Sequence, residues 1–236
     1  MHIAGLQKMT LLDYPGRVAC TVFLHGCNFR CPFCHNSGLL SGQGEAMMAE
    51  DELLAFLQKR KGLLDGVCIT GGEPTLQKEL PQLLQKIKAI GYHVKLDTNG
   101  SRPEVLKALA EAGLVDYVAM DIKNSPANYP ETAGVKESML EAVGKSAAFL
   151  LSGTTAYEFR TTVVAELHDA ASIRDMGEWV QSLGGGQIPQ HWYLQRYADR
   201  DSVLQAGLHA PETEHMQEFA AVLKPYAACV ELRGVE

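Results

Sequence analysis

The sequence has neither a long apolar run nor an excess of basic residues. No stretch of about 18 apolar residues is present that would span a bilayer, and residues 1–10 lack the sustained apolar segment of a signal peptide. Lysine and arginine together number 21 against 28 aspartates and glutamates, which gives a formal net charge of −7. Nucleic-acid-binding proteins usually carry a basic patch or stripe. The sequence therefore predicts a cytoplasmic protein with no membrane partner and no nucleic-acid partner.

Cysteine is also scarce, with six residues in 236. Because the cytosol is reducing, its cysteines are better interpreted as ligands or buried thiols than as disulfides. Cys20, Cys68 and Cys229 each lie in an apolar, strand-like run. We therefore expect these three to be small buried hydrophobic residues.

The other three cysteines, Cys27, Cys31 and Cys34, fall within eight residues, and no fourth cysteine lies nearby. Iron–sulfur cubanes are normally held by four Cys thiolates. A loop that supplies three would leave one iron open to a small molecule, much as catalytic zinc sites keep one position free. If a cluster binds here, the loop predicts a reaction centre rather than an electron-transfer centre.

Strand-like and helix-like segments alternate along the chain, which predicts βαβ units and a parallel sheet, either open or curled into a partial barrel. The length fits one α/β domain over residues 1–236, in which residues 1–17 lead into the first strand and residues 25–36 form the cluster loop. The expected strands cover residues 18–24, 66–70, 92–96, 117–122, 157–164, 191–195 and 229–232. The expected helices cover residues 49–61, 76–90, 103–112, 136–151, 172–183 and 212–226.

Unusual polar residues follow these strands one after another. Parallel α/β folds place their chemistry at the carboxyl ends of the strands, so we expect these residues to converge on one edge of the sheet. The first strand leads into the cysteine loop, and the later ones deliver Gly71, Gly72, Glu73 and Pro74, then Asp97, Thr98 and Asn99, then Asp121, Lys123 and Asn124, then Arg160, and then Gln195.

The chemistry of these residues suggests roles for them. Gly71 and Gly72 would let a ligand approach the backbone and leave main-chain groups free, and Glu73 is an acceptor suited to an ammonium group. Lys123 and Arg160 could pair with a carboxylate.

The remaining groups suit a nucleoside. Oxygen atoms of Asp97, Thr98, Asn99 and Asp121 could hold ribose hydroxyls or a hard cation, and Phe33 offers an aromatic face for adenine. Ammonium, carboxylate, ribose and adenine are the recognition groups of S-adenosylmethionine.

Simpler interpretations exist for each piece. Gly71 and Gly72 could form an ordinary turn, and residues 97–100 could be a turn that caps the next helix. His25 and His35 could be ordinary loop histidines, although His35 adjoins Cys34 beside the expected cofactor. Three further histidines are expected at the surface: His168, His209 and His215.

Together these residues resemble the radical S-adenosylmethionine (SAM) superfamily. The resemblance rests on C-x3-C-x2-C with Phe33 before its last cysteine, and on the Gly-Gly-Glu-Pro run that begins 37 positions after Cys34. It implies a [4Fe–4S] cluster held by Cys27, Cys31 and Cys34, whose open iron is chelated by the amino and carboxylate groups of SAM. One electron from the cluster would then cleave SAM to methionine and a 5′-deoxyadenosyl radical, which abstracts hydrogen from a substrate.

A narrower resemblance, to the glycyl-radical-enzyme activases, covers almost the whole chain. It rests on residues 13–17, 34–36, 97–100 and 121–123, and the chain is most similar to the longer type of anaerobic ribonucleoside-triphosphate reductase activating protein. The resemblance implies a partial (β/α)6 TIM-like barrel, a glycyl-radical enzyme as partner, and a flavodoxin- or ferredoxin-type electron donor. It also implies a monovalent-cation site formed by Asp97, Thr98, Asp121 and the Ala119 carbonyl.

Two other functions are weighed against this one. A radical SAM enzyme with a small-molecule substrate, such as a modified-nucleobase precursor, would need the same cofactor residues. A non-catalytic zinc module would use the three cysteines and a histidine, but it would leave residues 71–74 and the strand-end carboxylates unexplained.

Overall fold

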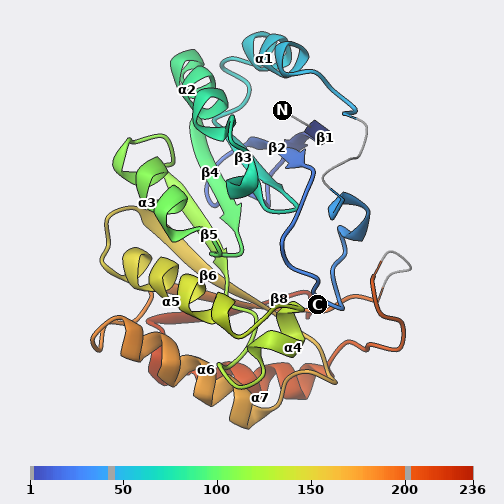
Figure 1. Ribbon diagram of the computed structural model, residues 1–236, viewed down its shortest axis with the longest axis vertical. Helices are drawn as coiled ribbons and strands as arrows, with labels where there is room; N and C mark the ends of the chain where they lie inside the picture. Colours follow the sequence, from blue (N-terminus) through green and yellow to red (C-terminus); the bar gives the residue numbers. More distant parts are fainter. Residues whose placement is uncertain (1–2, 42–45, 200–202, 236) are drawn as a thin grey trace. The chain divides into compact units, whose positions relative to one another are not determined.

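The computed structural model describes residues 3–41, 46–199 and 203–235 of the chain, which adopts an α/β fold (Figure 1). Eight strands follow one another in chain order through one sheet. Over the described residues, no helix is both long and apolar enough to cross a membrane. The chain divides into two compact units, which comprise Met1–Asn28, Gly38–Thr98 and Glu104–Ala119 in the first, and Phe29–Ser37, Asn99–Pro103 and Met120–Glu236 in the second.

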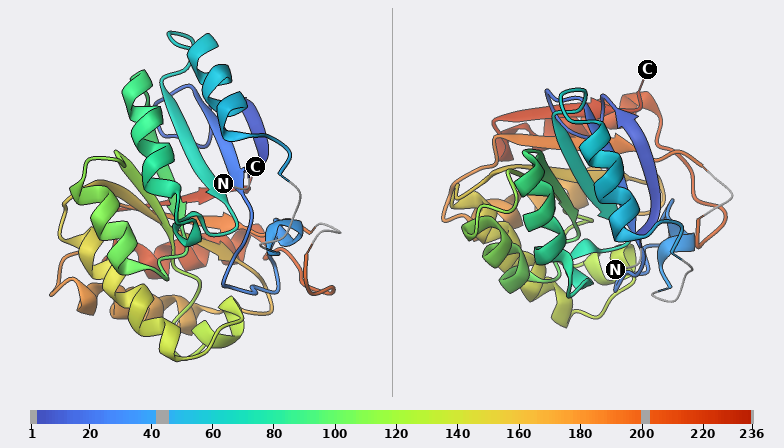
Figure 2. Two further views of the ribbon diagram at one scale, coloured as in Figure 1. Left: turned by 45° about the horizontal axis from the view of Figure 1, so that its top comes forward. Right: turned by 90° about the horizontal axis from the view of Figure 1, so that it is seen from above.

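The first unit is built on parallel strands with one antiparallel strand at the edge. Strand β1 pairs antiparallel with β2, and β2, β3 and β4 pair in parallel. Both views in Figure 2 show α1 and α2 side by side along these strands. The elements are β1 (Ile3–Thr10), β2 (Ala19–Leu24), α1 (Glu50–Lys59), β3 (Gly66–Gly71), η2 (Pro74–Leu76), α2 (Leu80–Ile90), β4 (His93–Thr98) and α3 (Pro103–Glu111); η1 (Ser37–Leu39) begins at the boundary between the units.

The core of the first unit follows from the periods of its sequence. Helix α2 buries Leu80, Leu83, Leu84 and Ile87 on one face, the i, i+3, i+4, i+7 pattern of an amphipathic helix. Each fully buried side chain of this kind contributes roughly 1.5–3 kcal/mol. Gly91 ends the helix in the left-handed region, at φ 107°, where glycine carries no side-chain penalty.

The second unit contains parallel strands covered by helices. Strands β6, β7 and β8 pair in parallel. Helices α5, α6 and α7 pack on one another along the buried face of these strands (Figure 1). Trp192 and Leu194 of β7 are fully buried on that face. The elements are α4 (Tyr129–Ala133), α5 (Ser138–Leu151), β6 (Ala156–Val163), α6 (Ala170–Leu183), β7 (His191–Arg196), α7 (Thr213–Leu223), η3 (Lys224–Tyr226) and β8 (Cys229–Arg233), while β5 (Tyr117–Asp121) runs from the first unit into the second.

The predicted fold class is confirmed, since every predicted strand and helix is present within a few residues of its expected bounds. Two elements were missed. Strand β1 lies inside the segment that we expected only to lead into the first strand; its buried residues do not alternate, because it pairs irregularly at the sheet edge. Helix α4 has five residues and includes Pro130, so it is too short to show a helical period.

The expectation for the three isolated cysteines is partly wrong. Cys20 and Cys68 are fully buried, as expected, and burial raises the pKa of the Cys20 thiol to about 12. Cys229 is only half-buried, because β8 is the last strand in the sheet that the described residues form.

Candidate active site

In the first unit, the glycines after β3 allow a close approach of backbone to backbone. Leu24, the last residue of β2, pairs with Gly71. A Cβ on Gly71 would lie 2.3 Å from the Leu24 amide nitrogen, and one on Gly72 would lie 2.0 Å from the Gly26 carbonyl oxygen. No side chain fits at either position, so these glycines fix the loop after β3 against the start of the cysteine loop.

Part of the main chain here is used by the protein itself, while the expectation that Gly71 and Gly72 leave other main-chain groups free for a ligand stays a prediction. The Gly72 N–H donates to the Leu24 carbonyl at 2.9 Å, and the Glu73 N–H donates to the Gly26 carbonyl at 2.7 Å. Both donors are therefore used by the chain itself. The cysteine loop is held in turn from its other side, because the Cys27 N–H donates to the Leu40 carbonyl at 3.4 Å.

Glu73 is fully buried, and threonines bind its carboxylate. The Thr75 N–H and the Thr98 hydroxyl donate to its Oε1 at 3.1 Å and 2.8 Å, and the Thr75 hydroxyl donates to the same oxygen. Hydrogen bonds to the ionised form stabilise a buried carboxylate. Thr98, at the end of β4, therefore positions Glu73 at the end of β3, and Pro74 follows as the buried first residue of η2.

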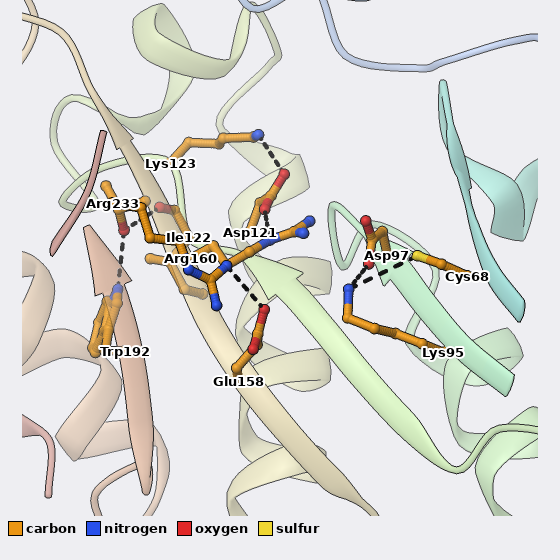
Figure 3. Close-up of polar contacts among 11 residues, drawn as sticks. Cys68, Lys95, Asp97, Asp121, Ile122, Lys123, Glu158, Arg160, Trp192 and Arg233 are labelled. Carbon is orange, nitrogen blue, oxygen red and sulfur yellow. Dashed lines mark hydrogen bonds and ion pairs between the residues drawn. The ribbon is translucent and has the colours of Figure 1, made fainter. Parts of the chain in front are cut away.

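A buried lysine that the sequence analysis missed lies beside Asp97. Lys95 is 1% exposed; its Nζ forms an ion pair with Asp97 and lies 3.9 Å from the Cys68 Sγ (Figure 3). A charged residue between Val94 and Leu96 in a central strand was the available signal, because a buried lysine is rarely tolerated without a partner.

In the second unit, α4 holds the middle of the cysteine loop. The Arg30 N–H donates to the Ala133 carbonyl at 3.0 Å, and the Cys31 Sγ lies 3.6 Å from the same oxygen. Gly134 has φ 62°, and a Cβ there would lie 2.3 Å from the Arg30 carbonyl oxygen. The loop also turns on itself through the Cys34 N–H, which donates to the Cys31 carbonyl at 3.1 Å.

The next residues of the loop lie against the segment after β7. The His35 Nε2 lies 2.7 Å from the Ala198 carbonyl oxygen, and the His35 ring stacks on Tyr197 with centroids 5.4 Å apart. Phe33 is 4% exposed, and the Lys123 ammonium lies 5.8 Å from its ring centroid. The structure therefore buries the ring that we expected to face adenine, and it gives His35 a role in fixing the loop.

Asp121, at the end of β5, pairs with two cations (Figure 3). Its Oδ1 lies 3.0 Å from the Arg160 Nε of β6, and its Oδ2 lies 2.8 Å from the Lys123 Nζ. Burial lowers the pKa of Lys123, but Asp121 and Cys31 more than compensate and raise it above its ordinary value. One carboxylate and two cations give this trio a formal charge of +1 in a largely buried setting.

His168 positions the backbone of Lys123, which corrects its assignment to the surface. The residue is 5% exposed, its Nε2 donates to the Lys123 carbonyl at 2.9 Å, and its Nδ1 accepts from the Val164 N–H at 3.2 Å. The Nδ1 also lies 3.3 Å from the Val164 carbonyl oxygen, so its role depends on the tautomer. Burial lowers the pKa of His168 and favours the neutral ring. His209 and His215 are exposed, as expected.

Asn124 has a structural role, and the cofactor contact that we expected of it stays a prediction. It is fully buried, and its side-chain amide donates to the Thr132 hydroxyl of α4 at 2.9 Å and to the Leu167 carbonyl at 2.7 Å. Asn124 therefore joins the loop after β5 to α4. Asn99 forms a local turn, since its Oδ1 accepts from the Ser101 N–H at 2.9 Å, which is the simpler interpretation of residues 97–100.

The expected monovalent-cation site stays a prediction. Two of its carboxylates already have protein cations as partners, with Lys95 on Asp97 and with Arg160 and Lys123 on Asp121. Gln195 lies near the end of β7, half-buried, where its backbone pairs with Thr162 and Arg233.

The three cysteines fit an iron–sulfur cluster by their donor chemistry. All three are free thiols, and their loop is held by backbone hydrogen bonds to Leu40 in the first unit and to Ala133 in the second. Lys123 provides a nearby positive charge, because it and Cys31 influence each other electrostatically. Iron–sulfur clusters are held by cysteine thiolates, and a nearby cation favours the thiolate form of a cysteine.

Comparisons with known proteins agree with this chemistry. The family model described as "Radical SAM superfamily" matches residues 21–145. A Methanocaldococcus jannaschii protein named "Putative glycyl-radical enzyme activating enzyme MJ1227" is 29% identical over 99% of this chain and 96% of its own length. A "Probable GTP 3',8-cyclase" of Thermococcus kodakarensis is 33% identical over 89% of this chain and 64% of its own length.

Solved structures share the fold at low sequence identity. Streptococcus suis SuiB bound to S-adenosylmethionine superposes with a TM-score of 0.65 at 14% identity, over 92% of this chain and 51% of SuiB. The structure titled "Structure of TYW1 with a lysine-pyruvate adduct bound" superposes with a TM-score of 0.60 at 15% identity, over 89% of this chain and 73% of that one. At these identities the likeness establishes the fold alone.

We expect His168 to make the stability of the folded chain depend on pH. Because its pKa is lowered in the folded state, the unfolded state takes up the proton first as the pH falls through about 6.5. The contribution is complete above that pH and is lost below it, by at most about 1.4 kcal/mol per pH unit. Urea unfolding between pH 5 and 8 measures this slope.

Replacing His168 with glutamine, which does not titrate, distinguishes the effect of His168 on the pH dependence of stability from the effects of other groups that take up protons in acid. His168→Gln keeps an N–H donor for the Lys123 carbonyl but does not titrate, so it should flatten the slope below about pH 6.5. The matched control is His215→Gln, an exposed histidine on α7, which should leave the slope unchanged. Equal slopes in both variants would contradict a buried neutral His168.

Proposed function

The chain belongs to the radical SAM superfamily, and from this premise we propose that it is a glycyl-radical-enzyme activating enzyme. The cofactors of the superfamily are a [4Fe–4S] cluster and SAM, for which Cys27, Cys31 and Cys34 are the cluster ligands we propose. When bound and reduced by an external electron donor, the cluster would supply one electron to SAM, breaking its sulfur–C5′ bond to give methionine and a 5′-deoxyadenosyl radical that abstracts hydrogen. Such a cluster needs a reducing compartment, and we place the protein in the cytoplasm on that ground.

The trio of Asp121, Lys123 and Arg160 is the observation that carries SAM binding. Its formal charge of +1 suits the SAM carboxylate, because charge-assisted hydrogen bonds to Arg and Lys are strong in a partly buried setting. Asp121 holds both cations in place (Figure 3), so their side chains need little ordering when the ligand binds.

Other residues are proposed around the rest of the cofactor. Glu73, fixed by threonine hydroxyls, would accept from the SAM ammonium, and Asp97 and Thr98 would hold the ribose. Gly71 and Gly72 act by seating the cysteine loop. We propose that a further set of residues contributes less to SAM binding, mainly by shaping the loops around the cofactor. These residues are Phe33, His35, Pro74, Asn99, Asn124 and Gln195.

One relative of matching length favours an activase over a small-molecule enzyme. This relative, named as an activating enzyme, corresponds to this chain over 96% of its own length, whereas the chain covers 64% of a relative named as a GTP cyclase. Two other relatives named as activating enzymes are covered over 52% and 42% of their own lengths. A small-molecule substrate remains the second candidate, supported by that relative and by a "7-carboxy-7-deazaguanine synthase" of Koribacter versatilis, 40% identical over 39% of the chain. For the activase we propose an anaerobic ribonucleoside-triphosphate reductase as partner and a flavodoxin- or ferredoxin-type electron donor.

Replacing a cluster ligand should remove both the cluster and its chemistry. Cys31→Ala should lower the iron and sulfide content from about four of each per chain and should abolish reductive cleavage of SAM, measured as 5′-deoxyadenosine. The matched control is Cys20→Ala, a buried cysteine of β2, which should keep its iron. Zinc bound without iron in the wild-type protein would instead support a zinc module.

Lys123→Gln should weaken SAM binding while the cluster is retained. Losing one charge-assisted hydrogen bond costs about 1.5–3 kcal/mol, so the Kd for SAM should rise about 10- to 150-fold. Lys88→Gln is the matched control, because Lys88 also pairs with an aspartate, Asp116, at 2.7 Å. Unchanged affinity in the Lys123 variant would remove Lys123 from the SAM contacts.

Electron paramagnetic resonance tests the activase step. The reduced, reconstituted protein, mixed with SAM and an anaerobic ribonucleoside-triphosphate reductase, should generate a glycyl-radical signal. A reductase whose radical glycine is replaced by alanine serves as the control and should give none. SAM cleavage without this signal, together with turnover of a purine-type small molecule, would favour the second candidate.

A further inference from the structure

Three metal-ligating side chains of different kinds lie together on the last two strands of the second unit. His191 opens β7, and Cys229 and Glu231 lie on β8. His191 and Cys229 are directly paired across the two strands, and Glu231 is the next residue along β8 on the same face. The strand pairing therefore brings a nitrogen, a sulfur and an oxygen donor together on a rigid support.

The distances between the donor atoms approach those of a coordination shell. The Cys229 Sγ lies 3.6 Å from the Glu231 Oε1, the His191 Nδ1 lies 3.9 Å from the same oxygen, and all three atoms lie within 4.8 Å of one another. A tetrahedral ion with Zn–S near 2.3 Å and Zn–N or Zn–O near 2.1 Å sets its ligand atoms about 3.4–3.6 Å apart.

The charges around the three side chains leave this position open to a cation. The nearest basic side chain on β8 is Arg233, which pairs with Glu158 at 3.6 Å and lies over the Tyr193 ring at 3.5 Å from its centroid. The His191 and Glu231 side chains are 47% and 52% exposed, so an ion and its water ligands can reach them.

We propose that His191, Cys229 and Glu231 bind a divalent transition-metal ion of the zinc type, with water in the fourth position. Imidazole, thiolate and carboxylate together suit a borderline ion and not Mg²⁺ or Ca²⁺, which prefer oxygen ligands. The Cys229 thiol releases its proton to solvent when the ion binds. The bound ion joins the edge strand β8 to β7. This proposal does not depend on the proposed function, because none of the three residues belongs to the candidate active site.

Zinc binding to the cluster-loaded protein tests the proposal. The reconstituted protein, without a histidine tag and treated with chelator, is dialysed anaerobically against Zn²⁺ and analysed for both metals. We expect one zinc per chain in addition to the iron, and a higher Tm with zinc because the ion binds the folded state. Cys229→Ala and His191→Ala should each weaken zinc binding at least tenfold while the iron content stays the same.

Two further variants keep the result interpretable. His209→Ala is the matched control, since His209 also pairs with a carboxylate, Glu166, at 2.6 Å but has no thiol beside it, and it should bind zinc like the wild type. Glu231→Gln should weaken binding even if a Cys229 variant fails to fold. Absence of zinc from the iron-loaded protein, or equal binding in the His191 and His209 variants, would overturn the proposal.

Discussion

The pairing of Asp121 with Lys123 and Arg160 is the interaction on which the candidate active site depends. It joins the ends of β5 and β6, and the Ile122 N–H donates to the Arg160 carbonyl at 2.9 Å alongside it. Because two cations share one carboxylate, the group carries a net positive charge in a partly buried environment. The electrostatic attraction of an anionic ligand to that charge is stronger there than in water. His168 and Asn124 then fix the loop that carries Lys123.

Close backbone approach is the second constraint. Gly71 and Gly72 bring the loop after β3 against residues 24–26, and Gly134 brings the end of α4 against Arg30. Each unit therefore holds its own part of the cysteine loop by contacts that no side chain could fit. Backbone contacts this close restrict each segment before any ligand binds, which reduces the entropy lost when that segment contacts a ligand.

Most of the fold could be predicted from the sequence, because long amphipathic helices and apolar strands show their period locally. Strand β1 and helix α4 could not, since one pairs irregularly at an edge and the other is too short. The roles of single residues were predicted less well. Asn124 and Phe33 are of residue types that suit contacts with the cofactor, and both lie next to sequence motifs of the expected site. Both are buried, however, and their burial depends on neighbours that are distant in sequence.

The sequence by itself determined the spacing of Cys27, Cys31 and Cys34, the Gly-Gly-Glu-Pro run and the alternation of strands and helices, because these are properties of adjacent residues. Only the tertiary structure decided which polar groups support others. Lys95 lies buried beside Asp97, His168 beneath Lys123, and Cys229 beside His191. The physical reason is that burial and strand pairing join residues many positions apart, and a linear sequence carries no direct record of those contacts.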